Sequence, residues 1–339
     1  MKLIKTEDAV GHVLCHDLTQ IIKDQYKDAR FRKGHVVTQE DIPVLLSMGK
    51  EHLYVWEMTP GMLHENDAAE RLYTLCVGDH MDRSEVKEGK IELKAACDGL
   101  FRVNSEKLMA VNSIEDIMIA TRKGGTAVRK GDKLAGMRVI PLIIPEEKLQ
   151  AAEQAAGDTP LLELKPWVRR TAAIVATGSE VKKGLIQDTF TPVVKDKLAF
   201  YGIETLSVSY SGDGVENVAN AIKEARATGA DVILCTGGMS VDPDDNTPGG
   251  IKESGAKIIT YGAPVLPGAM FLLGYYDDGT PVMGLPGCVM YAGATIFDLV
   301  LPFVAADVPV TRQQIVALGE GGLCLGCKPC HWPECPFGK

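Results

Sequence analysis

Short apolar runs alternate with amphipathic segments through the second half of the chain. Runs of strand length predict buried strands, the first ending in a loop, at residues 171–180, 203–208, 231–236 and 257–261. Apolar side chains at helical spacing predict helices at residues 190–201, 215–228 and 289–304. Residues 271–276 and 281–285 predict a hairpin. Strands that alternate with crossover helices predict an α/β fold, a doubly wound and mostly parallel sheet with helices on both faces.

The first half has a different, mixed α+β pattern. Helical spacing predicts helices at residues 41–48 and 64–78, each ending near a glycine. Residues 89–144 carry short strand signals, residues 108–112 among them, separated by Asn, Gly and Asp. This pattern predicts a small β-barrel or sandwich. An Ala- and Glu-rich helical stretch within residues 145–166 is expected to link the two halves.

These patterns predict a chain of several parts. The expected parts are a mixed α/β segment at residues 1–88, a small β subdomain at 89–145, a linker at 146–167, an α/β domain at 168–310 and a Cys-rich tail at 320–339.

Composition and charge narrow the class of protein. The chain has 339 residues, is 45% hydrophobic and 24% charged, and carries a formal net charge of −9, so it can form sizeable cores. An acidic surface repels phosphate backbones and anionic lipids, so neither nucleic acid nor a membrane is expected as a partner. Asp298 and Asp307 interrupt the most apolar stretch, and the first residues lack a secretory apolar region. A cytoplasmic protein is therefore expected.

Polar loops follow the predicted strands, where ligands of parallel sheets bind. The sequence TGGMSVDPDDNT begins at Thr236, and its two glycines allow a ligand to approach the backbone closely. Its carboxylates at Asp242, Asp244 and Asp245 are hard oxygen ligands, which favours Mg²⁺ beside a bound phosphate. A solvated acidic turn is the alternative interpretation.

Three further loops are expected at the same edge of the sheet. TGSE ends at Glu180, and SGDG contains Asp213, so each loop offers small residues and one carboxylate. GLPG, at residues 284–287, precedes the last predicted helix, whose N-terminal amides are suited to an anion.

These loops, in this order and together with LPG at residues 266–268, resemble the molybdopterin-binding domain of the molybdopterin molybdenumtransferase (MoeA) family. The resemblance covers about residues 168–308. It implies a protein that binds molybdopterin or adenylylated molybdopterin and, with Mg²⁺, inserts molybdate or tungstate and releases AMP. It also implies a homodimer and a recipient molybdoenzyme.

Residue roles follow from the same resemblance. The implied catalytic residues are Glu180, Asp213 and Asp245. The implied pterin- or phosphate-binding residues are Thr177, Gly178, Ser179, Thr236, Gly237, Gly238, Ser240, Asp242, Pro267, Gly268, Pro286 and Gly287. The expected magnesium ligands are Asp213, Asp242 and Asp245.

The chain also departs from the family pattern. The family's K-P-G-K-P segment is here Leu266 to Met270, which lacks both lysines, and its G-L-P-G-N-P segment continues with Cys288 and Val289. The family's M-D-G-Y-A segment and C-terminal β-domain are not found. Losing two lysines weakens charge-assisted phosphate binding unless Lys182, Lys183 or Lys252 replaces them. Pterin binding is therefore better supported than metal insertion.

The tail carries the second chemical signal. Four of the nine cysteines, at positions 324, 327, 330 and 335, have the spacing C-x2-C-x2-C-x4-C-P. Four thiolates so close in sequence can hold one Zn²⁺ or one iron–sulfur cluster. The ferredoxin run is one residue shorter, so the spacing leaves both metals open.

The leading hypothesis is an enzyme of molybdenum cofactor biosynthesis, a molybdenumtransferase-like insertase. The alternative is a non-catalytic carrier or sensor of molybdopterin whose tail binds a metal or responds to redox state. An electron-transfer protein built on the tail, and a nucleotide hydrolase of the competence-damage type, are weaker alternatives.

Overall fold

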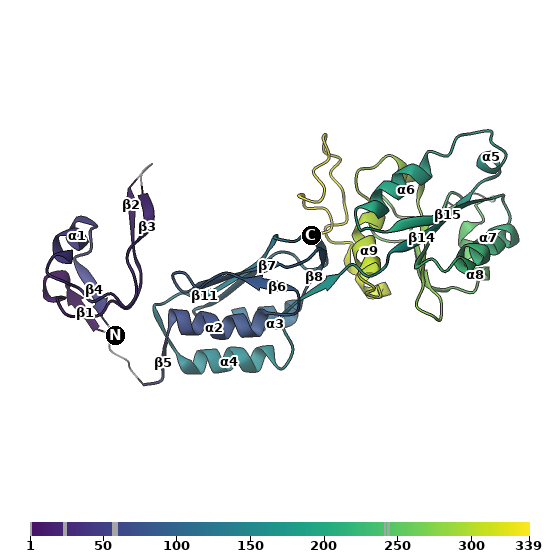
Figure 1. Ribbon diagram of the computed structural model, residues 1–339. Helices are drawn as coiled ribbons and strands as arrows, with labels where there is room; N and C mark the ends of the chain where they lie inside the picture. The colour runs from purple at the N-terminus through teal and green to yellow at the C-terminus, as the bar shows by residue number, and fades with distance from the viewer. Residues whose placement is uncertain (1, 23–25, 56–59, 241, 243–244) are drawn as a thin grey trace. The chain divides into compact units, whose positions relative to one another are not determined.

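Figure 1 presents the computed structural model, which describes residues 2–22, 26–55, 60–240, 242 and 245–339. The chain forms two compact units. The amino-terminal unit comprises residues 1–96, 103–122 and 130–163, and the carboxyl-terminal unit comprises residues 97–102, 123–129 and 164–339.

A six-stranded sheet forms the centre of the carboxyl-terminal unit, in the order β15-β14-β16-β19-β18-β17. Its strands are β14 (Thr171–Thr177), β15 (Glu204–Ser211), β16 (Val232–Thr236), β17 (Lys257–Tyr261), β18 (Leu272–Tyr275) and β19 (Pro281–Leu285). The pairs β14·β15, β14·β16 and β16·β19 are parallel, whereas β18 pairs antiparallel with both β19 and β17. The predicted strands, the hairpin and the mostly parallel α/β fold are confirmed.

Alternate side chains of the central strands pack on opposite faces of this sheet. Ile174 and Leu234 belong to the core that includes α6 (Phe190–Ala199) and α9 (Ile296–Ala305). Val175 and Cys235 belong to the core that includes α7 (Val215–Ala227) and α8 (Thr247–Glu253). Helices therefore cover both faces, as predicted, and Figure 1 shows α6 and α7 on opposite sides of β14.

The apolar segment at residues 289–304 is helical only in its second part. Residues Gly287–Met290 form a short 3-10 turn, and α9 begins at Ile296. Thr295 and Asp298 form a capping box that fixes this start. GLPG thus does not lead directly into a helix N-terminus, and the expectation of an anion site on those amides was wrong.

Three short helices in this unit have no counterpart in the predictions. They are α5 (Ser179–Lys182), α8 and α10 (Arg312–Ala317). In α8, a side chain at Gly250 would lie 2.4 Å from Val218 Cγ1. The glycine therefore allows α8 to pack closely on α7.

The amino-terminal unit is built from small antiparallel sheets and helices. Its elements near the start of the chain are β1 (Lys2–Lys5), η1 (Thr6–Asp8), β2 (Leu18–Ile22), β3 (Tyr26–Phe31), α1 (Asp41–Ser47) and β4 (His52–Val55). Then come β5 (Met62–His64), α2 (Glu65–Cys76), β6 (Met81–Arg83), β7 (Lys90–Ala95), α3 (Ser105–Asn112), β9 (Ile117–Thr121), β11 (Lys133–Val139), β12 (Ile143–Pro145) and α4 (Glu146–Ala156). The predicted helices at residues 41–48 and 64–78 and the helical stretch before residue 166 are confirmed.

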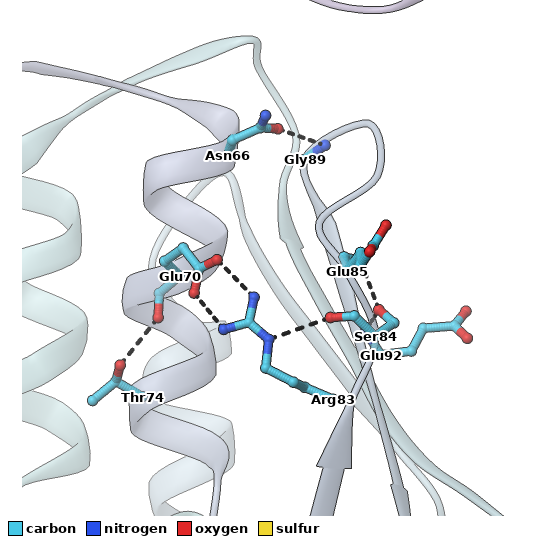
Figure 2. A network of polar contacts seen from close by, with 8 residues as sticks. All are labelled: Asn66, Glu70, Thr74, Arg83, Ser84, Glu85, Gly89 and Glu92. Atoms are coloured by element: carbon cyan, nitrogen blue, oxygen red, sulfur yellow. Dashed lines mark hydrogen bonds and ion pairs between the residues drawn. The ribbon is translucent and has the colours of Figure 1, made fainter. Parts of the chain in front are cut away.

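Helix α2 is fixed to the strands of this unit by polar contacts at its exposed side (Figure 2). The guanidinium of Arg83, on β6, donates to both carboxylate oxygens of Glu70 at 2.8 and 2.6 Å. The Glu70 carboxylate raises the pKa of Arg83. One turn earlier, Asn66 Oδ1 accepts the Gly89 backbone N–H at 3.1 Å. These bonds set the helix against the sheet β6-β7-β11-β9.

The short strands of residues 89–144 lie in separate sheets. β7, β9 and β11 join β6, whereas β8 (Gly99–Val103) and β10 (Thr126–Val128) pair with each other, and β8 also pairs with β13 (Leu162–Pro166). The strand expected at residues 108–112 was wrong, because these residues lie in α3, where Asn104 caps the helix through Lys107 N–H. Over the parts of the chain that the structure describes, no helix has the length and apolarity to cross a membrane.

Candidate functional site

Two buried threonines close the carboxyl ends of the central strands. Thr177 ends β14 and Thr236 ends β16. Thr177 Oγ1 donates to the Thr236 carbonyl at 3.0 Å and lies 2.8 Å from Thr247 Oγ1, at the start of α8. All three side chains are at most 8% exposed. This network fixes the position of the loop that leaves β16.

The predicted glycine turn follows directly. Gly237 and Gly238 have φ values of +85° and +55°. A side chain at Gly237 would lie 2.3 Å from the Thr177 carbonyl, and one at Gly238 would lie 2.8 Å from Thr247 Oγ1. Only glycine satisfies both the left-handed backbone and the close approach at Gly237. The turn therefore leaves its outer side free of side chains.

A cavity of about 430 Å³ opens over this turn. This volume lies in the range of small-molecule sites. Its lining consists of Gly237, Gly238, Met239, Ser240, Asp245, Gly268, Ala269, Met270, Pro286, Gly287, Cys288, Met290 and Tyr291. Among the residues that the structure describes, the lining contains one carboxylate and neither lysine nor arginine, so an anionic ligand would depend on backbone amides there.

Tyr261, at the end of β17, supports the cavity wall from outside the lining. Its hydroxyl donates to the Met239 carbonyl at 3.1 Å and lies 3.4 Å from the Ser240 carbonyl. Burial, and then the nearby charge of Asp245, raise the pKa of Tyr261. The tyrosine thus stays protonated and holds the loop that carries Met239 and Ser240.

The loops with Glu180 and Asp213 lie beside each other at the carboxyl ends of β14 and β15. The Asp213 backbone N–H donates to Ser179 Oγ at 3.4 Å, and Asn217 Nδ2 donates to the Asp213 carbonyl at 2.7 Å. The side chains of Glu180 and Asp213 are exposed, and neither residue lines the cavity. The Lys182 side chain lies over Gly212, so this pair of loops carries a positively charged group.

The third acidic loop is described only in part. Asp245 lines the cavity, Asp242 is exposed, and Asp244 lies outside the described residues. Asp245 N–H donates to the Asp242 carbonyl at 2.9 Å. Where the chain is described, no three His, Cys, Asp or Glu side chains are close enough to hold a metal ion. The described carboxylates therefore do not form a magnesium site, and their role as Mg²⁺ ligands stays a prediction.

The loop with Pro267 and Gly268 forms another wall. A side chain at Gly268 would lie 2.5 Å from Ile296 Cγ2, and the Ile296 N–H donates to the Pro267 carbonyl at 3.3 Å. The loop is thus seated on the start of α9. Leu266 is exposed and Ala269 lines the cavity, at the two positions where the resembled pattern has lysines.

Several residues of the site escaped the sequence-based predictions. They are Met239, Tyr261, Thr247, Met270, Cys288, Met290 and Tyr291. Most lie on loops, where apolar side chains give no periodic signal. Thr247 is the exception, because a threonine before Pro-Gly is typical of a helix start.

Two family models match the chain. Residues 173–306 match a family described as "Probable molybdopterin binding domain". Residues 3–57 match a domain of unknown function. The first match spans the central sheet and every residue of the cavity lining. It supports the resemblance to the molybdopterin-binding domain family.

Curated relatives match over a short region. A CinA-like protein of Desulfosudis oleivorans is 37% identical over 86 residues, which is 25% of this chain and 21% of that protein. A CinA-like protein of Mycobacterium avium is 32% identical over 80 residues, 24% of this chain and 18% of that protein. The chain spans about a fifth of the length of the curated relatives it matches.

Solved structures are similar at low identity. The molybdopterin biosynthesis moea protein of Pyrococcus horikosii is 16% identical, covers 91% of this chain and 75% of its own, and has a TM-score of 0.34. The tungsten cofactor synthesizing protein MoaB of Pyrococcus furiosus is 21% identical, covers 38% of this chain and 86% of its own, and has a TM-score of 0.31.

Proposed function

We propose that the cavity beside Gly237 and Gly238 binds molybdopterin or its AMP adduct, and that the protein acts in molybdenum cofactor biosynthesis. One observation carries the proposal. The match to the molybdopterin-binding domain family covers the loops after β16 and β19, and these loops line the cavity.

The cavity's chemistry suits a flat ring with an anionic arm. Tyr291 is 80% exposed at the cavity and offers an aromatic face to a pterin ring, with Met290 beside it. The backbone amides of the Gly237–Gly238 turn are the donors for the phosphate, because the described lining residues include no lysine or arginine. The carboxylate of Asp245 would repel that phosphate. We therefore expect this carboxylate to face a cation bound together with the molybdate, or a hydrogen-bond donor of the pterin ring.

The leading activity is insertion of molybdate, or tungstate, into adenylylated molybdopterin. Water adds to phosphorus as the phosphoanhydride bond between the pterin phosphate and AMP breaks, AMP leaves, and the oxygen that molybdate loses to the pterin sulfurs leaves as water. Glu180 and Asp213 carry exposed carboxylates on the two loops beside the cavity loop, and they remain our candidates, with Asp245, for acids of this step.

The second candidate is a carrier or sensor that binds molybdopterin without turnover. It is favoured by Leu266 and Ala269, which stand where the resembled pattern has two lysines, and by the lack of lysine and arginine among the described lining residues. Fewer charge-assisted contacts to the phosphates would lower the stabilisation of a transition state at the phosphates more than the ground-state binding of the aromatic pterin ring.

AMP release from adenylylated molybdopterin separates the two candidates. The purified protein is mixed with the adduct, Mg²⁺ and either molybdate or tungstate, and AMP is quantified while pterin binding is followed by its fluorescence. Binding with AMP release supports the insertase, and binding alone supports the carrier. If the protein binds neither molybdopterin nor its AMP adduct, the whole proposal is contradicted.

Two aspartates provide a matched pair for this assay. Asp245→Ala removes the carboxylate of the cavity, whereas Asp277→Ala removes an exposed carboxylate in the β18–β19 turn, at the other end of the sheet. We expect the first change to weaken adduct binding mainly when Mg²⁺ is present and the second to leave binding unchanged. If Asp245→Ala weakens adduct binding equally with and without Mg²⁺, Asp245 is not the predicted Mg²⁺ ligand.

A further inference from the structure

The Cys-rich tail forms a closed loop on the carboxyl-terminal unit. The Gly338 N–H donates to the Gly321 carbonyl at 2.9 Å, which joins the two ends of residues 322–337. A side chain at Gly321 would lie 2.6 Å from the Lys339 carbonyl, so the two strands of chain meet closely at this base. Phe337 is only 2% exposed and packs edge-on against Trp332, 5.7 Å between ring centroids.

The four cysteines are distributed symmetrically on this loop. Cys324 follows the base at Gly321 by three positions, and Cys335 precedes the base at Gly338 by three positions. Both are partly buried against the core that contains α9. Cys327 and Cys330 lie between them and are exposed. The base thus places the two outer cysteines on the two legs of the loop, each three residues from it, with the inner pair on the span that connects them.

We propose that this loop is a binding site for one soft divalent metal ion, held by the thiolates of Cys324, Cys327, Cys330 and Cys335. Four S–H groups lose their protons and four metal–sulfur bonds form, with no change in oxidation state, and Zn²⁺ is the ion that four cysteines hold best as a structural site. In the structure the sulfurs are not gathered into such a group. Binding therefore requires the exposed span to fold over the outer pair.

The surroundings suit an anionic metal centre. A divalent ion with four thiolates carries two net negative charges. Lys328 and Lys339 lie on the tail itself and offset part of this charge. Gly326 has a φ of +67°, and no atom lies within 4 Å of the position that a side chain would take there. The span therefore turns at Gly326 with open space around it. An ion thus meets few obstacles in drawing Cys327 inward.

The tail is hydrogen-bonded to one segment that leads into the cavity lining and packs against another. The Leu266 N–H donates to the Gly322 carbonyl and the Cys324 N–H donates to the Leu266 carbonyl, both at 2.8 Å. Leu266 begins the loop whose Gly268 and Met270 line the cavity. Cys330 Sγ lies 2.6 Å from the position of a side chain at Gly293, just beyond Tyr291. Metal binding at the tail therefore also orders the cavity walls.

Metal stoichiometry tests the site directly. The full-length protein is stripped with a chelator under reducing conditions, loaded with Zn²⁺ and desalted, and bound zinc is measured by mass spectrometry. We expect about one Zn²⁺ per chain. Cys327→Ser with Cys330→Ser should abolish tight binding, whereas Cys97→Ser, the same change at a partly exposed cysteine outside the tail, should retain it.

Cobalt substitution and hydrogen exchange complete the test. Co²⁺ should give a thiolate charge-transfer band that the double variant lacks. Zn²⁺ should slow exchange at the amides of Leu266 and Cys324 but not at a distant strand such as β7. No bound zinc, zinc retained in the double variant, or a protein that takes up iron and sulfide in place of zinc would each overturn the proposal. These measurements need no pterin, so their outcome is independent of the proposed function of the cavity.

Discussion

The hydroxyl groups of Thr177 and Thr247 form a hydrogen bond of 2.8 Å directly behind the Gly237–Gly238 turn of the cavity. Thr177 has one hydroxyl proton and donates it to the Thr236 carbonyl, so Thr247 is the donor in the bond between the two threonines. A side chain from β14 thereby connects β16 with the start of α8. The position of the turn depends on this pair.

Removing the Thr177 hydroxyl should destabilise the carboxyl-terminal unit. Thr177→Val keeps the shape but leaves the Thr236 carbonyl and the Thr247 hydroxyl without these partners, at a cost of about 2 kcal/mol in the free energy of unfolding. Thr247→Val removes one bond and should cost about 1 kcal/mol. Thr189→Val, at an exposed position, should change stability by less than about 0.5 kcal/mol. Urea denaturation followed by circular dichroism gives all three values; equal values would contradict the role of the network.

Gly237 should tolerate no side chain. Gly237→Ala adds a methyl group 2.3 Å from the Thr177 carbonyl at a φ of +85°. Gly229→Ala adds the same group at a similar φ of +77°, with no atom within 4 Å. Gly229→Ala should lower the free energy of unfolding by about 1 kcal/mol, because of the left-handed backbone alone. Gly237→Ala should lower it by about 3 kcal/mol, because the close contact with the Thr177 carbonyl adds to that strain.

The comparison of these two glycines also tests the cavity. They flank β16 at opposite ends, so only Gly237→Ala should reduce pterin binding. Thermal unfolding and pterin titration of both variants separate backbone strain from the close contact. Similar losses of stability in both would show that the carbonyl moves away easily.

The sequence predicted the central sheet because its strands carry continuous apolar runs bounded by glycine loops. Ile174 and Val175 face different cores, so both must be apolar, and this pattern is typical of a strand covered on two faces. The convergence of the loops at Gly178 and Gly237 then followed from parallel connectivity. This logic holds whatever ligand binds.

The same reasoning failed where packing or capping overrides apolar content. Gly249 and Gly250 oppose helix formation, yet α8 forms because Gly250 permits close packing on Val218. The high apolar content of residues 289–304 predicts one helix, although the Thr295–Asp298 pair marks the true start at Ile296. The cavity side chains Tyr291 and Met270 lie on loops, where only the tertiary fold brings them together.

Asp245 should control the titration of Tyr261. Burial comes first among the causes that raise the pKa of Tyr261, and the charge of Asp245 adds to it. Asp245→Asn removes the charge and should lower the pKa of Tyr261, although burial keeps it above the ordinary value. Ultraviolet difference titration measures this change, and Tyr261→Phe identifies the signal among the nine tyrosines.

Asp277→Asn is the control for Asp245→Asn, because both changes remove one carboxylate charge. That side chain is exposed at the other end of the sheet and should not alter the titration of Tyr261. An unchanged titration in Asp245→Asn would place the Asp245 carboxylate away from Tyr261, and with it away from this side of the cavity.

His64 should make the amino-terminal unit sensitive to acid. Its side chain is 6% exposed, Nε2 donates to the Cys15 carbonyl at 2.5 Å, and Nδ1 accepts the Asn66 N–H at 3.1 Å. Burial, and then the charge of Lys33, lower the pKa of His64. Protonation of Nδ1 removes the acceptor that caps α2. The folded state therefore binds the proton less readily than the unfolded chain.

The sign of the effect follows from this difference. Below the ordinary histidine pKa of about 6.5, the unfolded chain takes up a proton that folded His64 resists, so stability falls as pH decreases until the lowered pKa is reached. Urea midpoints at about pH 8 and about pH 5.5 should therefore differ in the wild type. His64→Gln should reduce the difference without abolishing it, because burial also lowers the pKa of His16. His52→Gln, on the exposed side of β4, should keep the full difference, and the same full difference in His64→Gln would refute the assignment.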